Sequence, residues 1–361
     1  MSKRAINFSA GPATLPVQVL EEARRDLVDY QGSGMSVMEM SHRSPEYDAI
    51  HRGTSDVIRT LMRVPESHAI LFLQGGASQQ FSMVPMNLMH PGRRADYVVT
   101  GVWSKKAVKE AQREGAVRVA ATTEDESFSR IPAASELDLD SGADYVHITT
   151  NNTIAGSQWW TTPDTGSVPL VADMSSDIMS HPVPTERFGL IYAGAQKNLG
   201  PAGVTIVIAD KELLERAPST LPTMLQYRTF AEKDSLFNTP PCWSIYVVGL
   251  VCRWVASQGG LVAMERSNRA KAGLIYDLFD TGDFYRGTVA SESRSIMNIP
   301  FRLPNEELEK RFVAESKAAG MTNLKGHRSV GGIRASVYNA MPRSGVEALV
   351  DFMREFERAH G

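Results

Sequence analysis

The sequence predicts an α/β fold built on a mostly parallel sheet with helices on both faces. Short apolar runs alternate with helix-periodic stretches through most of the chain. Most of these runs are apolar throughout rather than alternating, which is typical of strands buried on both faces. The alternation of strands and helices indicates an α/β layer. The expected strands are 69–73, 97–100, 117–121, 145–149, 169–173, 190–193 and 204–208.

Helices are expected between these strands, for example over 50–61 and along the charged stretch 105–114. A helical stretch over 245–256 is followed by Ser257-Gln258-Gly259-Gly260, which predicts a break. Beyond it come a long helical run, strand-like runs at 295–301 and 332–338, a helix near 306–319, and an amphipathic last helix. We therefore expect an N-terminal arm (1–15), a large domain (16–259) and a smaller α+β domain (260–361).

Composition narrows the class of protein. The 361 residues are 42% hydrophobic and 22% charged, as in ordinary globular proteins. The net charge of −3 provides no broad basic field, so we expect no nucleic-acid partner. Cys242 and Cys252 form no CxxC pattern, and no two histidines lie within five residues, so neither disulfides nor a metal site is expected. No apolar run approaches about 20 residues, which predicts a cytoplasmic protein without a membrane segment.

Lys197 is the first candidate for a catalytic residue. It lies in a loop of small residues between apolar runs at 190–192 and 204–208. Taken alone, such a loop also fits a surface lysine. However, a lysine held on a crowded loop has a lowered pKa, which lets its amine attack a carbonyl. Asp173 ends another strand-like run 24 residues upstream. This pair predicts pyridoxal 5′-phosphate (PLP), with Asp173 on the pyridinium nitrogen and Lys197 in the Schiff base.

Three further groups follow strand ends. The run Gly75-Gly76-Ala77-Ser78 would expose backbone N–H groups at a helix start and so bind phosphate. Trp103 can stack on a flat heterocycle, and Thr153 can hold a phenolic oxygen. Each group also has a purely structural explanation: a turn, a Trp that closes the core, a capped loop. Ligands of open α/β sheets bind beyond the carboxyl ends of strands, so the shared position of these groups favours a cofactor site.

Positively charged residues indicate the substrate. His42-Arg43 lies near the start of the chain, and His327-Arg328 and Arg334 lie in Gly- and Ser-rich segments near its end. Arginine binds carboxylates and phosphates through two parallel hydrogen bonds, and histidine adds a donor. A solvated surface is the alternative explanation. The pattern predicts pockets for an anionic substrate.

Nearly from end to end, the chain resembles the phosphoserine aminotransferases, PLP enzymes of fold type I. The most similar runs are 8–13, Ser36-Val37-Met38-Glu39-Met40-Ser41-His42-Arg43, 192–198, Phe237-Asn238-Thr239-Pro240-Pro241 and 325–328. The resemblance implies a homodimer with shared active sites. It also implies transfer of the amino group of L-glutamate to 3-phosphohydroxypyruvate, giving O-phospho-L-serine and 2-oxoglutarate in serine biosynthesis. A longer phosphorylated 2-oxo acid of pyridoxine biosynthesis is left open as a second substrate.

The resemblance also implies roles for the cofactor-binding residues. Lys197 would carry the cofactor, Asp173 would pair with its ring nitrogen, Trp103 would lie against the ring and Thr153 near the ring hydroxyl. The cofactor phosphate would be surrounded by Ala77, Ser78 and Gln196, and by Asn238 and Thr239 of the partner subunit. Some family members carry Arg where this chain has Ser78, so here the phosphate relies more on backbone N–H groups and hydroxyls.

For the substrate, the resemblance implies that Arg334 binds the α-carboxylate. The distal phosphate, or the glutamate side chain, would be held by His42, Arg43, His327 and Arg328. Two other functions stay open. A PLP lyase or desulfurase shares the fold, although neither Cys242 nor Cys252 is placed like a mobile catalytic cysteine. A non-catalytic phosphate-binding protein is disfavoured by the intact set of cofactor-binding residues.

Overall fold

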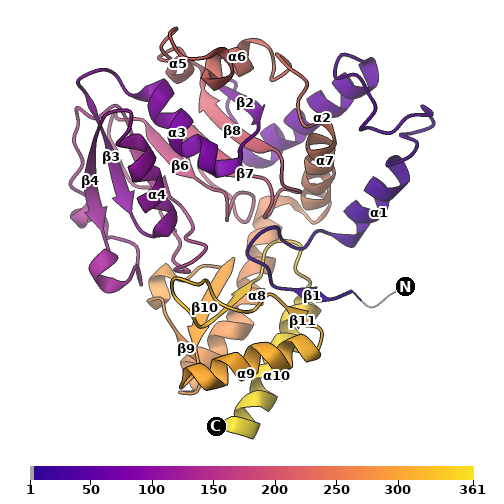
Figure 1. Ribbon diagram of the computed structural model, residues 1–361, viewed down its shortest axis with the longest axis vertical. Helices are drawn as coiled ribbons and strands as arrows, with labels where there is room; N and C mark the ends of the chain where they lie inside the picture. The colour runs from indigo at the N-terminus through magenta and orange to yellow at the C-terminus, as the bar shows by residue number, and fades with distance from the viewer. Residues whose placement is uncertain (1–3) are drawn as a thin grey trace.

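A seven-stranded sheet forms the centre of the larger part of the molecule (Figure 1). The computed structural model describes residues 4–361 and orders the strands β2–β8–β7–β6–β5–β3–β4. Only β8 runs antiparallel to its neighbours, so the predicted, mostly parallel sheet is confirmed. Each strand overlaps a predicted one. The bounds are β2 (His68–Leu73), β3 (Arg94–Val99), β4 (Ala116–Thr122), β5 (Val146–Thr149), β6 (Leu170–Asp173), β7 (Leu190–Gly194) and β8 (Thr205–Asp210).

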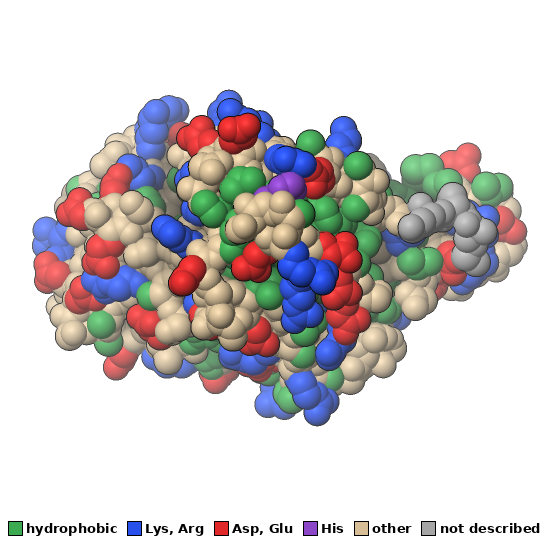
Figure 2. All heavy atoms as spheres, turned by 90° about the horizontal axis from the view of Figure 1, so that it is seen from below, with side chains coloured by type: hydrophobic (Ala, Val, Ile, Leu, Met, Phe, Trp, Pro, Cys, Tyr) green, Lys and Arg blue, Asp and Glu red, His purple; other side chains and the backbone are tan. Residues whose placement is uncertain are grey.

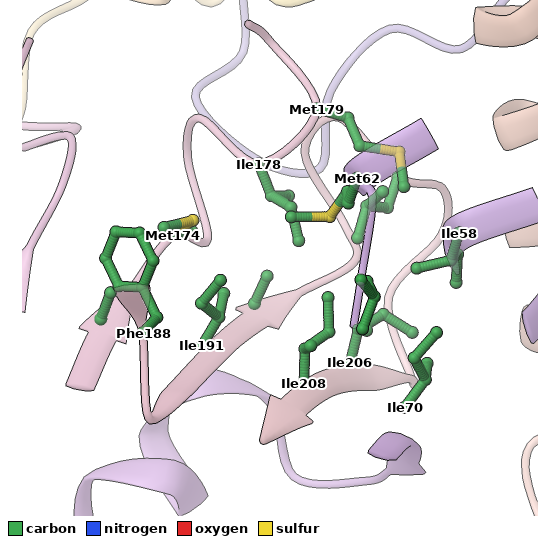
Figure 3. Packing of buried hydrophobic residues seen from close by; sticks show 14 of the residues in the cluster. Ile58, Met62, Ile70, Met174, Ile178, Met179, Phe188, Ile191, Ile206 and Ile208 are labelled. Carbon is green, nitrogen blue, oxygen red and sulfur yellow. The ribbon is translucent and has the colours of Figure 1, made fainter. Parts of the chain in front are cut away.

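Helices cover both faces of this sheet because successive residues of its strands are apolar and point to opposite sides. On one face, the sheet packs with residues of α2 and α7. Figure 3 shows Ile58 and Met62 of α2 near the strand residues Ile70, Ile191, Ile206 and Ile208. On the other face, the alternate strand residues pack against α3, α4 and α6. The helices of this part are α1 (Val17–Asp26), α2 (Pro45–Met62), α3 (Gly76–Leu88), α4 (Val102–Ala111), α5 (Lys211–Leu214), α6 (Tyr227–Glu232) and α7 (Cys242–Ser257).

The C-terminal part has its own small sheet and its own core. Helix α8 (Gly260–Thr281) follows α7 after a bend of 81° at the predicted break. An antiparallel sheet in the order β12–β10–β9 then packs with the last helices around a second apolar cluster. The bounds are β9 (Arg286–Gly287), β10 (Asn298–Arg302), α9 (Glu306–Ala318), β11 (Met321–Thr322), β12 (Ile333–Ser336) and α10 (Arg343–His360). Short 3-10 helices span Glu124–Glu126, Ala134–Glu136, Thr185–Arg187, Thr223–Leu225 and Ser291–Ser293.

The N-terminal segment lies against this second part. Strand β1 (Ile6–Asn7) pairs in parallel with β11, and Phe8 is buried in the C-terminal cluster. The N-terminal segment is therefore packed against the C-terminal part, and Figure 1 shows β1 beside β11. The division into an arm, a large domain and a small domain at 15/16 and 259/260 stays a prediction.

The surface carries charges of both signs. On the face drawn in Figure 2, Lys and Arg side chains alternate with Asp and Glu, without a broad field of one sign. Across residues 4–361, no single helix has the length and apolar composition to cross a membrane. The helices α7 and α8 meet these two criteria only when they are taken together, and the chain bends between them.

Candidate active site

The strands other than β8 run in one direction, so their carboxyl ends meet at one edge of the sheet. The loops that leave this edge enclose a cavity of about 390 Å³. Seven of the predicted site residues line it: Ala77, Ser78, Trp103, Thr153, Asp173, Gln196 and Lys197. The sheet thus brings together residues that lie up to 120 positions apart in the sequence.

Lys197 follows β7 and is partly buried in the cavity wall. Its Nζ donates a hydrogen bond to Thr153 Oγ1 at 2.6 Å. Burial lowers the pKa of Lys197 to about 8; the Asp173 carboxylate opposes this shift, and the Arg334 guanidinium adds to it. About a tenth of this amine is therefore unprotonated at pH 7, far more than for an exposed lysine, and the unprotonated form is the nucleophile.

Two buried carboxyl groups lie near Lys197. Asp173 ends β6, and its Oδ1 accepts a hydrogen bond from the Ser175 backbone N–H at 2.9 Å. Burial raises the pKa of Asp173. Asp177, one helical turn further along the chain, accepts a hydrogen bond from Thr150 Oγ1 at 2.6 Å, and burial raises its pKa to about 7. Asp173 has no side-chain cation other than Lys197 acting on its pKa, so its carboxylate is available to a positive ligand.

The start of α3 forms the floor of the cavity. Gly75 and Gly76 have φ of 80° and 64°, in the left-handed region that suits glycine. They turn the chain from β2 into α3, so that the N–H groups of Ala77 and Ser78 belong to the first helical turn. Those N–H groups have no acceptor within the helix and carry the positive end of its dipole. The arrangement fits an anion such as a phosphate.

Several buried polar atoms around the cavity have no partner within residues 4–361. They are Trp103 Nε1, Thr149 Oγ1 and Arg334 Nε. Arg334 reaches the site from β12, and its NH1 donates to the Thr153 carbonyl at 3.3 Å. Because an unpaired buried polar group is costly, these atoms indicate a polar ligand. PLP is a flat heterocycle with several polar groups. Its phosphate suits the α3 N-terminus, its ring nitrogen suits Asp173 and its phenolic oxygen suits Thr153, so the residues fit PLP.

The N-terminal segment also belongs to the site. The Ala13 N–H donates to the Gln196 carbonyl at 2.9 Å, and the Tyr338 hydroxyl donates to the Ala10 carbonyl at 2.8 Å. A Cβ on Gly11 would lie 3.5 Å from the Lys197 side chain. The segment is thus packed directly against the loop that carries Lys197.

Other predicted site residues lie apart from the cavity. His42, Arg43, Asn238 and Thr239 do not line it; instead, His42 Nδ1 lies 3.1 Å from Thr239 Oγ1. His327 and Arg328 line a second cavity of about 560 Å³ in the C-terminal part. His327 nevertheless lies within electrostatic reach of Arg334, because its pKa is lowered by burial and then by the charges of Arg334, Arg328 and Lys106.

Sequence reasoning missed Asp177, Thr150 and Lys106. The spacing of Asp173 and Asp177 was visible, but Asp173 ends β6 and Asp177 lies in the loop after it, where a spacing of four does not guarantee a shared surface. Nothing in the sequence marks Thr150 among neighbouring threonines. Lys106 stands beside Lys105 in a charged helix, and the sequence does not show which of the two lies over the Trp103 ring.

Comparison with known proteins agrees with this geometry. Residues 5–349 match the family model of the class-V aminotransferases. A phosphoserine aminotransferase of Desulfatibacillum aliphaticivorans is 56% identical over the full length of both chains. The solved phosphoserine aminotransferase of Bacillus circulans subsp. alkalophilus is 53% identical and superimposes with a TM-score of 0.98 over 100% of both chains. The PLP-bound phosphoserine aminotransferase of Trichomonas vaginalis is 38% identical, with a TM-score of 0.93 over 97% of this chain and 100% of that one.

The fold and the cavity are thus those of a fold-type-I PLP-dependent transferase. The full-length identities narrow the assignment further. The chain belongs to the class-V aminotransferases and, among these, to the phosphoserine aminotransferase family.

Proposed function

We propose that this protein is a PLP-dependent transaminase. It moves the amino group of L-glutamate to 3-phosphohydroxypyruvate, which gives O-phospho-L-serine and 2-oxoglutarate, the amino-transfer step of serine biosynthesis. The observation that carries the proposal is Lys197: a half-buried amine with a pKa of about 8, bonded to Thr153 and influenced by Asp173, above a helix N-terminus. The family membership supports the same reaction.

When bound, PLP supplies an electron sink for the carbanion that forms at the substrate Cα. The protein holds the cofactor by its two ends. The first turn of α3, with Ala77, Ser78 and Gln196, would bind the phosphate, because these residues line the cavity at a helix N-terminus. Asp173 would pair with the ring nitrogen and keep it protonated, Trp103 would lie against the ring and Thr153 would bind the ring oxygen, since all three line the cavity.

Lys197 carries out the proton transfer. Its free amine would take the proton from the substrate Cα and hold it for the return transfer of the reaction. A pKa of about 8 suits this exchange, because the amine both accepts and releases a proton near neutral pH. Thr153, at 2.6 Å, fixes the direction of Nζ.

Both substrates carry a carboxylate and a second anionic end, and the protein offers cations for each. Arg334 binds the α-carboxylate, since it is partly buried and its Nε lacks a partner within the described chain. The distal phosphate, or the glutamate side chain, is held by His42, Arg43, His327 and Arg328. A phosphorylated 2-oxo acid of pyridoxine biosynthesis carries the same two anionic ends.

We further propose a cytoplasmic homodimer with shared active sites. Asn238 and Thr239 lie outside the cavity of their own chain, beside His42. In a dimer these residues would complete the site of the partner subunit. The two free cysteines, both buried, suit a reducing compartment.

The absorbance spectrum of the purified holoenzyme tests the reaction. We expect glutamate to remove the band of the Lys197-bound cofactor and 3-phosphohydroxypyruvate to restore it. Lys197→Ala is the control: it should lack this band and lose turnover by several orders of magnitude, roughly 10³-fold or more. A band that ignores glutamate would exclude a transaminase and leave a PLP lyase.

A further inference from the structure

Two adjacent lysines of α4 have different surroundings. The Lys105 ammonium group is paired with the Glu124 carboxylate on the outer surface. The Lys106 ammonium group lies 4.3 Å from the centroid of the Trp103 ring. Trp103 lines the candidate active site, so the charge of Lys106 lies beside the wall of that site. A cation over an indole face is held there by the ring quadrupole, which fixes the position of an otherwise mobile side chain.

Lys106 also lies within electrostatic reach of the C-terminal part of the chain. It is one of three cations that act on His327, together with Arg328 and Arg334. These residues come from α4, from the loop before β12 and from β12 itself. Their charges therefore converge on one region between the sheet edge and the small antiparallel sheet.

No carboxylate neutralises this group within residues 4–361. Lys106, Arg328 and Arg334 form no ion pair there, although eighteen ion pairs occur elsewhere in that part of the chain. In addition, the buried Arg334 Nε has no hydrogen-bond partner. Like charges that converge without a counter-ion repel one another, and an anionic ligand relieves that repulsion.

We propose that Lys106 is a further substrate-binding residue, which acts with His327 and Arg328 to hold the second anionic end of the substrate, beside the α-carboxylate site of Arg334, and favours a phosphate over a carboxylate. This inference rests on the proposed function. A phosphate ester carries about 1.5 to 2 negative charges at neutral pH, whereas a glutamate side chain carries one. An ammonium group on a flexible stem acts as a point charge, so its contribution grows with the charge of the ligand. Lys106 thereby favours the phosphorylated keto acid over unphosphorylated keto acids of the same size.

Lys106→Met tests this inference, because methionine keeps an apolar stem over Trp103 and removes the charge. We expect the KM for 3-phosphohydroxypyruvate to rise about 5-fold and the KM for glutamate about 2-fold, with kcat within about 2-fold of the original protein. Lys106→Arg should restore most of the lost affinity. Lys105→Met, one residue away and outside the site, is the matched control and should leave both KM values unchanged.

A binding measurement separates this inference from the proposed function. Calorimetric titration of the holoenzyme with inorganic phosphate needs no turnover, and we expect Lys106→Met to weaken phosphate binding about 5-fold while Lys105→Met does not. If the original protein fails the glutamate cycle but phosphate binding still depends on Lys106, the reaction is wrong and the anion site stands. Equal phosphate affinity in Lys106→Met and Lys105→Met overturns the inference. A shifted cofactor spectrum with a lowered kcat in Lys106→Met also overturns the inference, since Lys106 would then act through Trp103 on the cofactor.

Discussion

At the residue scale, burial prepares the amine of Lys197. The free energy that favours the neutral amine comes from removal of water, while the Asp173 carboxylate limits the shift. In the protein without cofactor, we expect Lys197 to react with an amine-directed acylating reagent with a midpoint near pH 8, well below that of exposed lysines. Asp173→Asn should lower this midpoint further, because it removes the negative charge that stabilises the ammonium form. Peptide mass analysis across pH measures both, and a midpoint near that of exposed lysines would contradict the role of burial.

Asp177 predicts how stability depends on pH. Its pKa is about 7 in the folded protein and near 3.8 when unfolded, so between these values the folded state holds a proton that the unfolded state has lost. Stability from this group is complete below pH 3.8 and is lost as pH rises toward 7. Each pH unit in this window costs about 1.4 kcal/mol.

The variant Asp177→Asn removes this titration. Between pH 5.5 and 7.5, the free energy of unfolding of the original protein should fall by about 2 kcal/mol more than that of the variant. Denaturant unfolding at both pH values provides the comparison. A parallel fall in the two proteins would show that Asp177 ionises at its ordinary pKa, so that the Asp173 carboxylate lies beside a second negative charge.

At the element scale, the turn from β2 into α3 depends on two glycines with different surroundings. A Cβ on Gly75 would lie 1.8 Å from Gln79 Oε1 and 2.6 Å from Gln79 Cβ, whereas one on Gly76 would meet nothing within 4 Å. Both substitutions would place an alanine at positive φ, which costs about 1–2 kcal/mol. We expect Gly76→Ala to lose about that amount and Gly75→Ala to lose more, with weaker retention of the cofactor phosphate. Thermal unfolding and titration of the cofactor-free proteins with PLP provide the test. Equal losses of stability in Gly75→Ala and Gly76→Ala would contradict a role for the Gln79 contact.

The elements also show what the sequence could predict. Strands buried on both faces are apolar throughout, so β2, β5, β6, β7 and β8 stood out locally. The direction of β8 and the pairing of β1 with β11 could not be predicted, because they depend on contacts between distant segments. The place of Lys197 and Asp173 in the cavity was predictable, since Asp173 ends such a strand and Lys197 follows another. The positions of the Asp177 and Lys106 side chains could not be predicted, because they depend on which way a loop or helix turns.

Contacts between distant segments also hold the Lys197 loop in place. Asn198 Oδ1 accepts a hydrogen bond from the Asn339 N–H at 3.0 Å, and Asn339 Nδ2 donates to the Met179 carbonyl at 2.9 Å. Asn268, on α8, donates to Asn339 Oδ1 at 2.8 Å. These buried amides join the loops after β6 and β7 to the C-terminal part. They therefore couple the position of Lys197 to that of Arg334, which β12 carries.

At the scale of the whole molecule, the cavity of one chain is lined by only part of the residues that the proposed function requires. The cavity is lined by seven of the predicted cofactor-binding residues, but His42 and Arg43 lie just before α2 and do not line it. In Figure 1 the segment between α1 and α2 extends to the outer edge of the molecule. A second copy of the chain is the simplest source of the missing groups, since a two-fold axis places the same surface of each subunit against the other.

Mixing two inactive variants tests this arrangement. Lys197→Ala removes the amine and Arg43→Ala removes a substrate-binding cation, so each homodimer alone should be nearly inactive. If Arg43 serves the partner subunit, a mixed dimer contains one site with both residues intact. After unfolding and refolding of an equal mixture, half of the dimers are mixed and each has one intact site, so activity should recover to about a quarter of the original value. If Arg43 instead serves the site of its own chain, every site in a mixed dimer lacks one residue and no activity returns; recovery therefore distinguishes a shared site from two separate ones.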